Sequence, residues 1–191
     1  MQELDSHIQS IGAAPGIEHD EIVIIPGGTK PARVSCIDYC PEQVSIQEID
    51  DLTDFTRRHR PEWTKVRWIN VDGLADTRTI QALAKKYDLH PLAVEDMLQK
   101  TQRPKVEPYG GEDSEFMARL FIVTQAVELV EGRLQNEQVS IFLGHSTVLT
   151  FQANRSTEWD PIRQRLKSKG SRLRKSDASF LAYSLLDAII D

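Results

Sequence analysis

The segment from 65 to 73, KVRWINVDG, restricts the fold more than any other part of the sequence. Its apolar residues do not alternate with polar ones, because Val66, Trp68, Ile69 and Val71 fall on both faces of an extended strand. A strand that is apolar on both faces is typical of a sheet covered by helices on both sides. The segment therefore predicts a buried strand of an α/β protein, and its final Asp-Gly pair predicts a turn.

Two helices are predicted directly after this strand. In the first, the apolar residues have the i, i+3, i+4, i+7 spacing of one helix face: Ile80, Leu83, Ala84 and Tyr87. Asp76 is placed to cap its N-terminus. This helix is expected to end near His90, because a residue that precedes proline disfavours the α conformation. Pro91 suits the first position of a second, short helix, and His90 is interpreted as the residue that leads into it.

The rest of the pattern adds strands and three more helices. Strands are predicted at 21–25, 33–38, 43–49, 115–124, 126–130, 137–143 and 147–151. The turns EGR and GHS between the later strands are short, which favours antiparallel hairpins. Helices are predicted over 50–59 and 160–169 and from 176 onward.

The two ends of the chain differ in character. Residues 1–20 show no sustained periodicity and are expected to form a flexible tail. The final segment, SFLAYSLLDAIID, is apolar and helical in pattern to its last residue, with no Gly, Asn or Pro to end a helix. We therefore expect a folded domain over 21–175, and the start of a longer helix, truncated in this chain, over 176–191.

The charge distribution favours cations over polyanions as partners. The 191 residues carry a net charge of −6, but 155–175 contain eight basic and two acidic residues. The rest of the chain is therefore acidic, and its field attracts cations. The basic segment is interpreted as the wet face of a helix; binding of RNA or anionic lipid there is the alternative. No apolar run is long enough to span a membrane and no signal peptide is present, which predicts a soluble chain that is not exported.

Several kinds of chemistry lack their sequence signals. Cys36 and Cys40 are the only cysteines, and no further Cys or His cluster completes a zinc site, so they are interpreted as two small residues near a strand. No nucleophile elbow, HExxH motif or glycine-rich phosphate loop occurs. The sequence thus predicts a protein that is not an enzyme.

The adjacent acids Glu95 and Asp96 lie inside the second predicted helix and have three possible roles. A helical wheel places both on one exposed face, while Val94, Met97 and Leu98 pack inward. Solvated surface acids, a metal-dependent hydrolase that uses both, and half of a cation site all remain open. A hard cation fits better than catalysis, because Mg²⁺ keeps several waters and needs only one or two carboxylates from one protein surface.

A resemblance to a known protein family favours one of these roles for Glu95 and Asp96. The chain resembles the cytoplasmic N-terminal domain of the CorA family of Mg²⁺ channels from about residue 20 to its end, through an ordered series of motifs: WINVDGL (68–74), LHPLAVEDML (89–98), QRPKVE (102–107), EQVSIFLGHSTVLTFQ (137–152), DPIRQRL (160–166) and YSLLDAIID (183–191). The resemblance implies an α/β/α sandwich with a mixed, largely antiparallel sheet. It also implies that 176–191 begin a long stalk helix.

The resemblance also implies a function. By motif, Asp96 matches the main aspartate of a regulatory divalent-cation site between subunits, Glu95 its neighbouring acid, and Asp187 a further acid from the last helix. The expected ligand is Mg²⁺, both regulatory and transported, with Co²⁺ or Ni²⁺ possible. The expected protein is a homopentamer in the cell membrane, with this part on the cytoplasmic side and no nucleic-acid partner. The alternative is the cytoplasmic domain of a ZntB-like zinc transporter of the same superfamily.

Overall fold

The computed structural model describes residues 31–99, 102–130, 133–155 and 157–190. Within them, one sheet is formed by the strands β1 Arg33–Tyr39, β2 Val44–Glu48, β3 Val66–Asp72, β4 Lys105–Tyr109, β5 Arg119–Val130, β6 Arg133–Leu143 and β7 Thr147–Gln152. The helices are α1 Leu52–Arg57, α2 Thr77–Tyr87, α3 Pro91–Leu98, α4 Asp160–Lys167, α5 Arg172–Lys175 and α6 Ala178–Ile190. The expected tail (1–20) and the first expected strand (21–25) lie outside the described residues.

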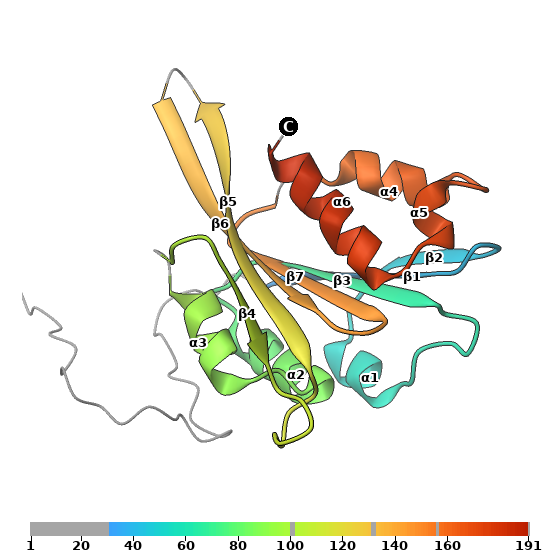
Figure 1. Ribbon diagram of the computed structural model, residues 1–191, viewed down its shortest axis with the longest axis horizontal. Coiled ribbons are helices and arrows are strands. Elements are labelled where there is room, and N and C mark those ends of the chain that lie inside the picture. Colours follow the sequence, from blue (N-terminus) through green and yellow to red (C-terminus); the bar gives the residue numbers. More distant parts are fainter. Residues whose placement is uncertain (1–30, 100–101, 131–132, 156, 191) are drawn as a thin grey trace, which may run out of the picture.

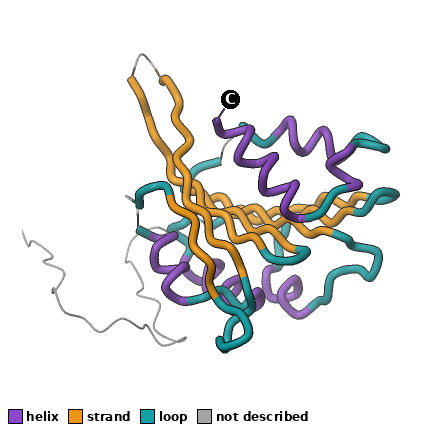
Figure 2. Tube along the Cα trace, viewed as in Figure 1, coloured by secondary structure: helices purple, strands orange, loops and turns teal. Residues whose placement is uncertain are grey.

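The sheet is mixed and mostly antiparallel. Its strand order is β2-β1-β3-β7-β6-β5-β4. β3 and β7 pair in parallel, whereas the other described neighbours pair antiparallel. Helices α1–α3 cover one face and α4–α6 the other, and the far part of the β5–β6 hairpin rises on the α4–α6 side and extends beyond those helices (Figures 1 and 2). The predicted α/β/α sandwich is confirmed.

β3 has the two-sided burial that its sequence predicts. Its residues from Val66 to Val71 are at most 4% exposed. Ile69 and Val71 belong to the core on the α1–α3 side, and Val66 and Trp68 belong to the core on the α4–α6 side. Because one strand contributes to both cores, it fixes the two helical layers relative to each other.

The ends of α2 and α3 follow the predicted signals. The Asp76 carboxylate accepts a hydrogen bond from the Thr79 amide at 3.1 Å and thereby caps α2. Asp88 closes that helix with a left-handed backbone (φ 51°). The His90 Nδ1 atom accepts a hydrogen bond from the Leu92 amide at 3.3 Å, so His90 is the N-cap of α3, as its place before Pro91 indicates.

Three elements differ from the sequence prediction. The expected strands 115–124 and 126–130 form the single strand β5, which begins only at Arg119. The chain before it turns through Gly110 and Gly111, both at positive φ. No separate strand is predicted over 105–109, where the structure has β4; this strand tolerates Pro108 because it lies at the sheet edge. The short helix α5 was not predicted.

Candidate cation site on the short helix

The two acids of α3 lie on its second turn, and both are half-buried. Val94 and Met97 pack into the core, as the helical wheel predicts, and Leu98 packs against the same core. The expectation of an exposed acidic face is only partly met, because the Asp96 side chain is 22% exposed. β4 runs beside α3 and supplies the groups that cover this carboxylate.

Asp96 is held by two side chains from the segment after α3. The Lys105 ammonium lies 2.5 Å from Asp96 Oδ2, and the Gln102 amide nitrogen donates to Oδ1 at 3.1 Å. Lys105 also lies 2.8 Å from Glu107 Oε2. The Tyr109 hydroxyl donates to the same Glu107 oxygen at 3.0 Å. One ammonium therefore bridges two carboxylates.

These contacts change the proton affinities of the groups around the bridge. Burial alone lowers the pKa of Lys105, but hydrogen bonds to Asp96 and Glu107 outweigh it and raise that pKa above its ordinary value. Hydrogen bonds from Lys105 and Tyr109 lower the pKa of Glu107. Burial, followed by the nearby Glu107, raises the pKa of Tyr109 to about 12. Lys105 is thus firmly held as a cation.

Lys105 and Glu107 are not among the predicted site residues, although the sequence contains a signal for them. In QRPKVE, a strand that begins at Lys105 places Lys105, Glu107 and Tyr109 on one face, because side chains alternate along a strand. A strand next to α3 would bring that face to Asp96. What single-sequence reasoning lacked was the knowledge that the sheet edge lies beside α3.

Asp187 does not join the α3 acids within one chain. It lies exposed on α6, where the Tyr183 hydroxyl donates to Asp187 Oδ1 at 3.3 Å. α6 and α3 cover opposite faces of the sheet (Figure 1). Among the described residues, no group of three or more His, Cys, Asp or Glu side chains is arranged to hold a metal ion. The carboxylate oxygens at α3 suit a hard cation, but as half of a coordination shell.

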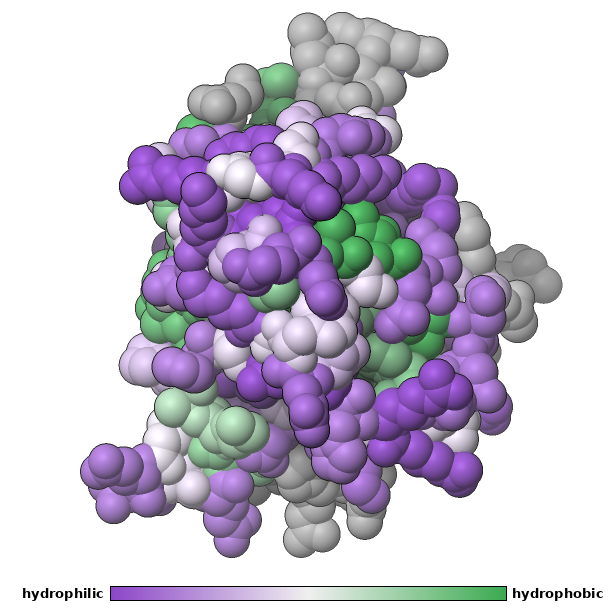
Figure 3. Space-filling view, turned by 90° about the vertical axis from the view of Figure 1, so that its right-hand side faces the viewer, coloured by the Kyte–Doolittle hydropathy of each residue, from purple (hydrophilic) through white to green (hydrophobic). Residues whose placement is uncertain are grey.

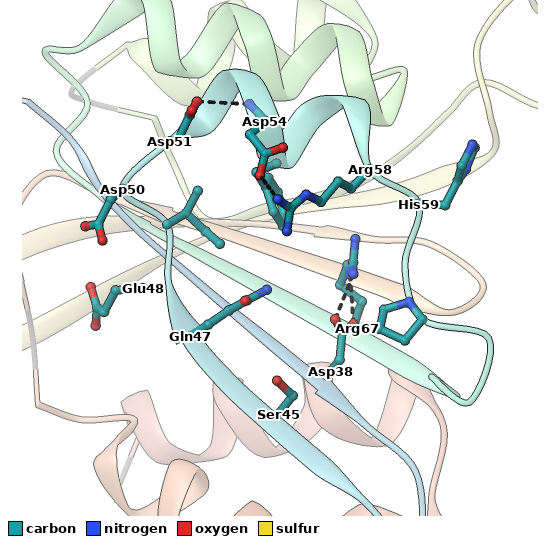
Figure 4. A pocket seen from close by; sticks show the side chains of 13 residues that line it. Asp38, Ser45, Gln47, Glu48, Asp50, Asp51, Asp54, Arg58, His59 and Arg67 are labelled. Atoms are coloured by element: carbon teal, nitrogen blue, oxygen red, sulfur yellow. Dashed lines mark hydrogen bonds and ion pairs between the residues drawn. The ribbon is translucent and has the colours of Figure 1, made fainter.

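A pocket lies between α1 and the strands β1 and β2. It encloses about 380 Å³, and Figure 4 shows its lining side chains. Arg67 and Asp38 form a buried ion pair there, and Arg58 pairs with Asp54 at 2.5 Å. Each of these ion pairs neutralises its own two charges, and Asp50 and Asp51 add further carboxylates to the lining.

The basic segment 155–175 is less free than its sequence suggests. Arg174 is 1% exposed, and its Nε donates to the Cys40 carbonyl oxygen at 3.1 Å. Arg163 lies over the Trp68 ring and Arg172 over the Phe180 ring, at 5.3 and 4.9 Å from the centroids. The interpretation of this segment as a solvent-exposed helix face is wrong for Arg174, which is buried, and only partly met for the half-buried Arg163, whereas Arg172 is exposed as predicted.

The cysteines lie in or next to a strand, as expected. Cys36 lies in β1 and Cys40 directly after it, and both are buried and free. Burial, followed by the charge of Asp38, raises the pKa of Cys36 to about 12, which disfavours the thiolate that a soft metal requires.

Among the residues that the structure describes, no helix is both long enough and apolar enough to cross a bilayer. Figure 3 shows one side of the molecule, on which hydrophilic residues predominate and apolar residues form small patches.

Comparison with known proteins agrees with the fold and with the motifs. The sequence model of the family described as "CorA-like Mg2+ transporter protein" matches residues 63–191. The cobalt/magnesium transport protein CorA of Thermotoga maritima is 39% identical over 126 residues, which make up 65% of this chain and 34% of that protein. The chain thus spans about a third of the length of this relative.

Two solved structures share the fold. The soluble domain of CorA from Methanocaldococcus jannaschii matches with a TM-score of 0.55 and 17% identity, over 82% of this chain and 55% of that one. The ZntB cytoplasmic domain from Vibrio parahaemolyticus matches with a TM-score of 0.59 and 11% identity, over 82% of this chain and 57% of that one. The matching family is one of transporters rather than enzymes, in line with the expected class. The chain belongs to the CorA-like Mg²⁺ transporter family.

Proposed function

We propose that this chain is the cytoplasmic Mg²⁺-sensing domain of a CorA-type magnesium and cobalt transporter of the cell membrane. Residues 21–175 would form the sensing domain, and 176–191 the start of the stalk helix that leads to the membrane part. Family membership supports the transport role. The half-buried Asp96 carboxylate on α3 is the single structural observation that carries the sensing role.

The position of the acids supports a site shared between copies of the chain. Glu95 and Asp96 lie on one face of the sandwich and Asp187 on the other, so one chain alone cannot bring them together (Figure 1). Two neighbouring copies in a homopentamer could place α3 of one against α6 of the next. Mg²⁺ would supply the charge that links the carboxylates, with its own waters completing the shell.

The chain's own residues set the direction of the response. Without a divalent cation, Glu95 of one copy and Asp187 of the next would repel each other across the interface, while Lys105 neutralises Asp96. A cation that binds the closed assembly better than the open one shifts the population toward the closed state, and its loss loosens the assembly. A sensor of this kind needs only weak affinity, which half-exposed carboxylates provide.

A ZntB-like zinc transporter of the same superfamily is the alternative. Zinc sites prefer nitrogen and sulfur ligands, whereas α3 offers carboxylate oxygens and its His90 is used as a helix cap. The donor set therefore favours Mg²⁺, with Co²⁺ or Ni²⁺ as possible further ligands.

The test is Asp96→Ala in the full-length protein. Mg²⁺ is expected to protect the wild type from limited proteolysis, and the variant should need at least about fivefold more Mg²⁺ for half-maximal protection. Asp113→Ala, which removes an exposed acid from the β4–β5 loop, is the control and should behave as wild type. Identical Mg²⁺ titrations for wild type and Asp96→Ala would refute the proposal. Zn²⁺ protecting at lower concentration than Mg²⁺ and Co²⁺ would favour the alternative.

A further inference from the structure

The segment that follows α3 places a positive charge at the site proposed for Mg²⁺. The Lys105 ammonium contacts Asp96 at 2.5 Å and Glu107 at 2.8 Å, and it lies 5.8 Å from the centroid of the Phe121 ring. The side chains of Lys105 and Asp96 are only 23% and 22% exposed. An ion pair this well covered is screened less by water and salt than one on an open surface.

The fold fixes this lysine at the site. β4 is the edge strand, and its pairing with β5 sets Lys105 opposite Val123 and Glu107 opposite Phe121. The alternate residue Val106 is 59% exposed, so the other face of β4 is open while the Lys105 face is turned toward α3. Gln102 further ties the loop to the helix by donating to Asp96 and to Gln99.

We propose that Lys105 is a built-in counter-cation, and that a divalent cation can use Asp96 only by displacing its ammonium. When the ammonium is displaced, it also frees the Glu107 carboxylate, which becomes a second ligand of the divalent cation. This proposal deepens the proposed function and rests on it, because it explains how the affinity of the Asp96 site is set.

Charge balance supports the exchange. Two positive charges on one carboxylate repel each other strongly in a partly buried site. An incoming cation must therefore break two contacts of the ammonium before it gains two carboxylates. The exchange keeps α3 neutralised both with and without the ion, and it weakens apparent affinity toward the concentrations at which a cellular Mg²⁺ sensor must respond.

The test is Lys105→Met in this chain, with Mn²⁺ as a paramagnetic stand-in for Mg²⁺ and binding followed by electron paramagnetic resonance. We expect the variant to bind Mn²⁺ at least about tenfold more tightly than wild type, a change equivalent to about 1.4 kcal/mol. Mg²⁺ should compete for the same site. Lys105→Arg, which keeps the charge, should bind as wild type, and Asp96→Asn combined with Lys105→Met should lose the gain.

Lys167→Met is the matched control, because it removes an exposed lysine from α4 on the opposite face of the sheet and should leave binding unchanged. Circular dichroism checks that each variant is folded. A second measurement needs no substitution at Lys105: its acylation by an N-hydroxysuccinimide ester, read by mass spectrometry, should rise when Mg²⁺ is added to the wild type.

The outcomes separate this proposal from the proposed function. Equal or weaker Mn²⁺ binding by Lys105→Met, or acylation of Lys105 that Mg²⁺ does not change, overturns the counter-cation role even where Asp96→Ala still weakens protection in the full-length protein. Conversely, tighter binding by Lys105→Met with unaltered protection in Asp96→Ala supports the local competition and overturns the sensing role.

Discussion

Asp38→Ala is expected to lower the free energy of unfolding by about 3–5 kcal/mol, because it leaves a buried arginine without its counter-ion. Arg67 donates from Nε and Nη2 to the two Asp38 oxygens at 2.8 and 2.7 Å. The two side chains are only 5% and 3% exposed. Burial lowers the pKa of Arg67, but its hydrogen bond to Asp38 outweighs that effect, and the net direction is upward. The guanidinium keeps its charge even when the aspartate is removed, because its ordinary pKa lies far above neutral pH.

Urea unfolding followed by circular dichroism measures the effect, with a lower midpoint and an unchanged m-value expected. The control is the double variant Asp38→Ala with Arg67→Met, which removes both charges and should recover much of the loss. Arg58→Ala is a second control, since its ion pair with Asp54 is solvent-exposed and should contribute less than about 1 kcal/mol. A loss for Asp38→Ala no larger than that of Arg58→Ala would contradict the buried-pair account.

The parts of this fold that follow from local chemistry were predictable from the sequence. The apolar residues on both faces of β3 predict helices on both sides of the sheet, and both layers are present. Asp76 and His90 cap helices through hydrogen bonds to amides two or three residues away, and Pro91 favours the helix start beside His90. Such signals span a few positions and need no knowledge of the fold.

The ion pairs were not predictable, because each joins separate elements. Arg67 meets Asp38 only because β1 and β3 are neighbours in the sheet. Lys105 meets Asp96 only because the edge strand β4 lies beside α3. The helical wheel therefore found the correct inward face of α3 but could not show that Asp96 is neutralised. The candidate site was identified through its acids, and its basic partner required the structure.

The largest effect on the α4–α6 layer is expected from Trp159→Ala, at about 3–5 kcal/mol of unfolding free energy. Trp159 is fully buried and packs edge-to-face on Trp68 with ring centroids 5.7 Å apart. Its Nε1 donates to the Leu185 carbonyl oxygen of α6 at 3.1 Å. The indole thus connects α6 to the central strand β3, and its removal eliminates both the ring packing on Trp68 and the hydrogen bond to α6.

Amide hydrogen exchange distinguishes a local loosening of α6 from destabilisation of the whole fold. In Trp159→Ala the amides of α6 should lose more protection than those of α2, whose buried residues belong to the core on the other face of the sheet. Trp159→Phe retains an aromatic ring but not the hydrogen bond, so it should cost less than the alanine variant while still raising exchange in α6. Uniform loss of protection in α2 and α6 would show that Trp159 supports the whole fold rather than this helix. Since α6 carries Asp187, selective loosening would also weaken Mg²⁺-dependent protection in the full-length protein, which links the position of this helix to the proposed shared site.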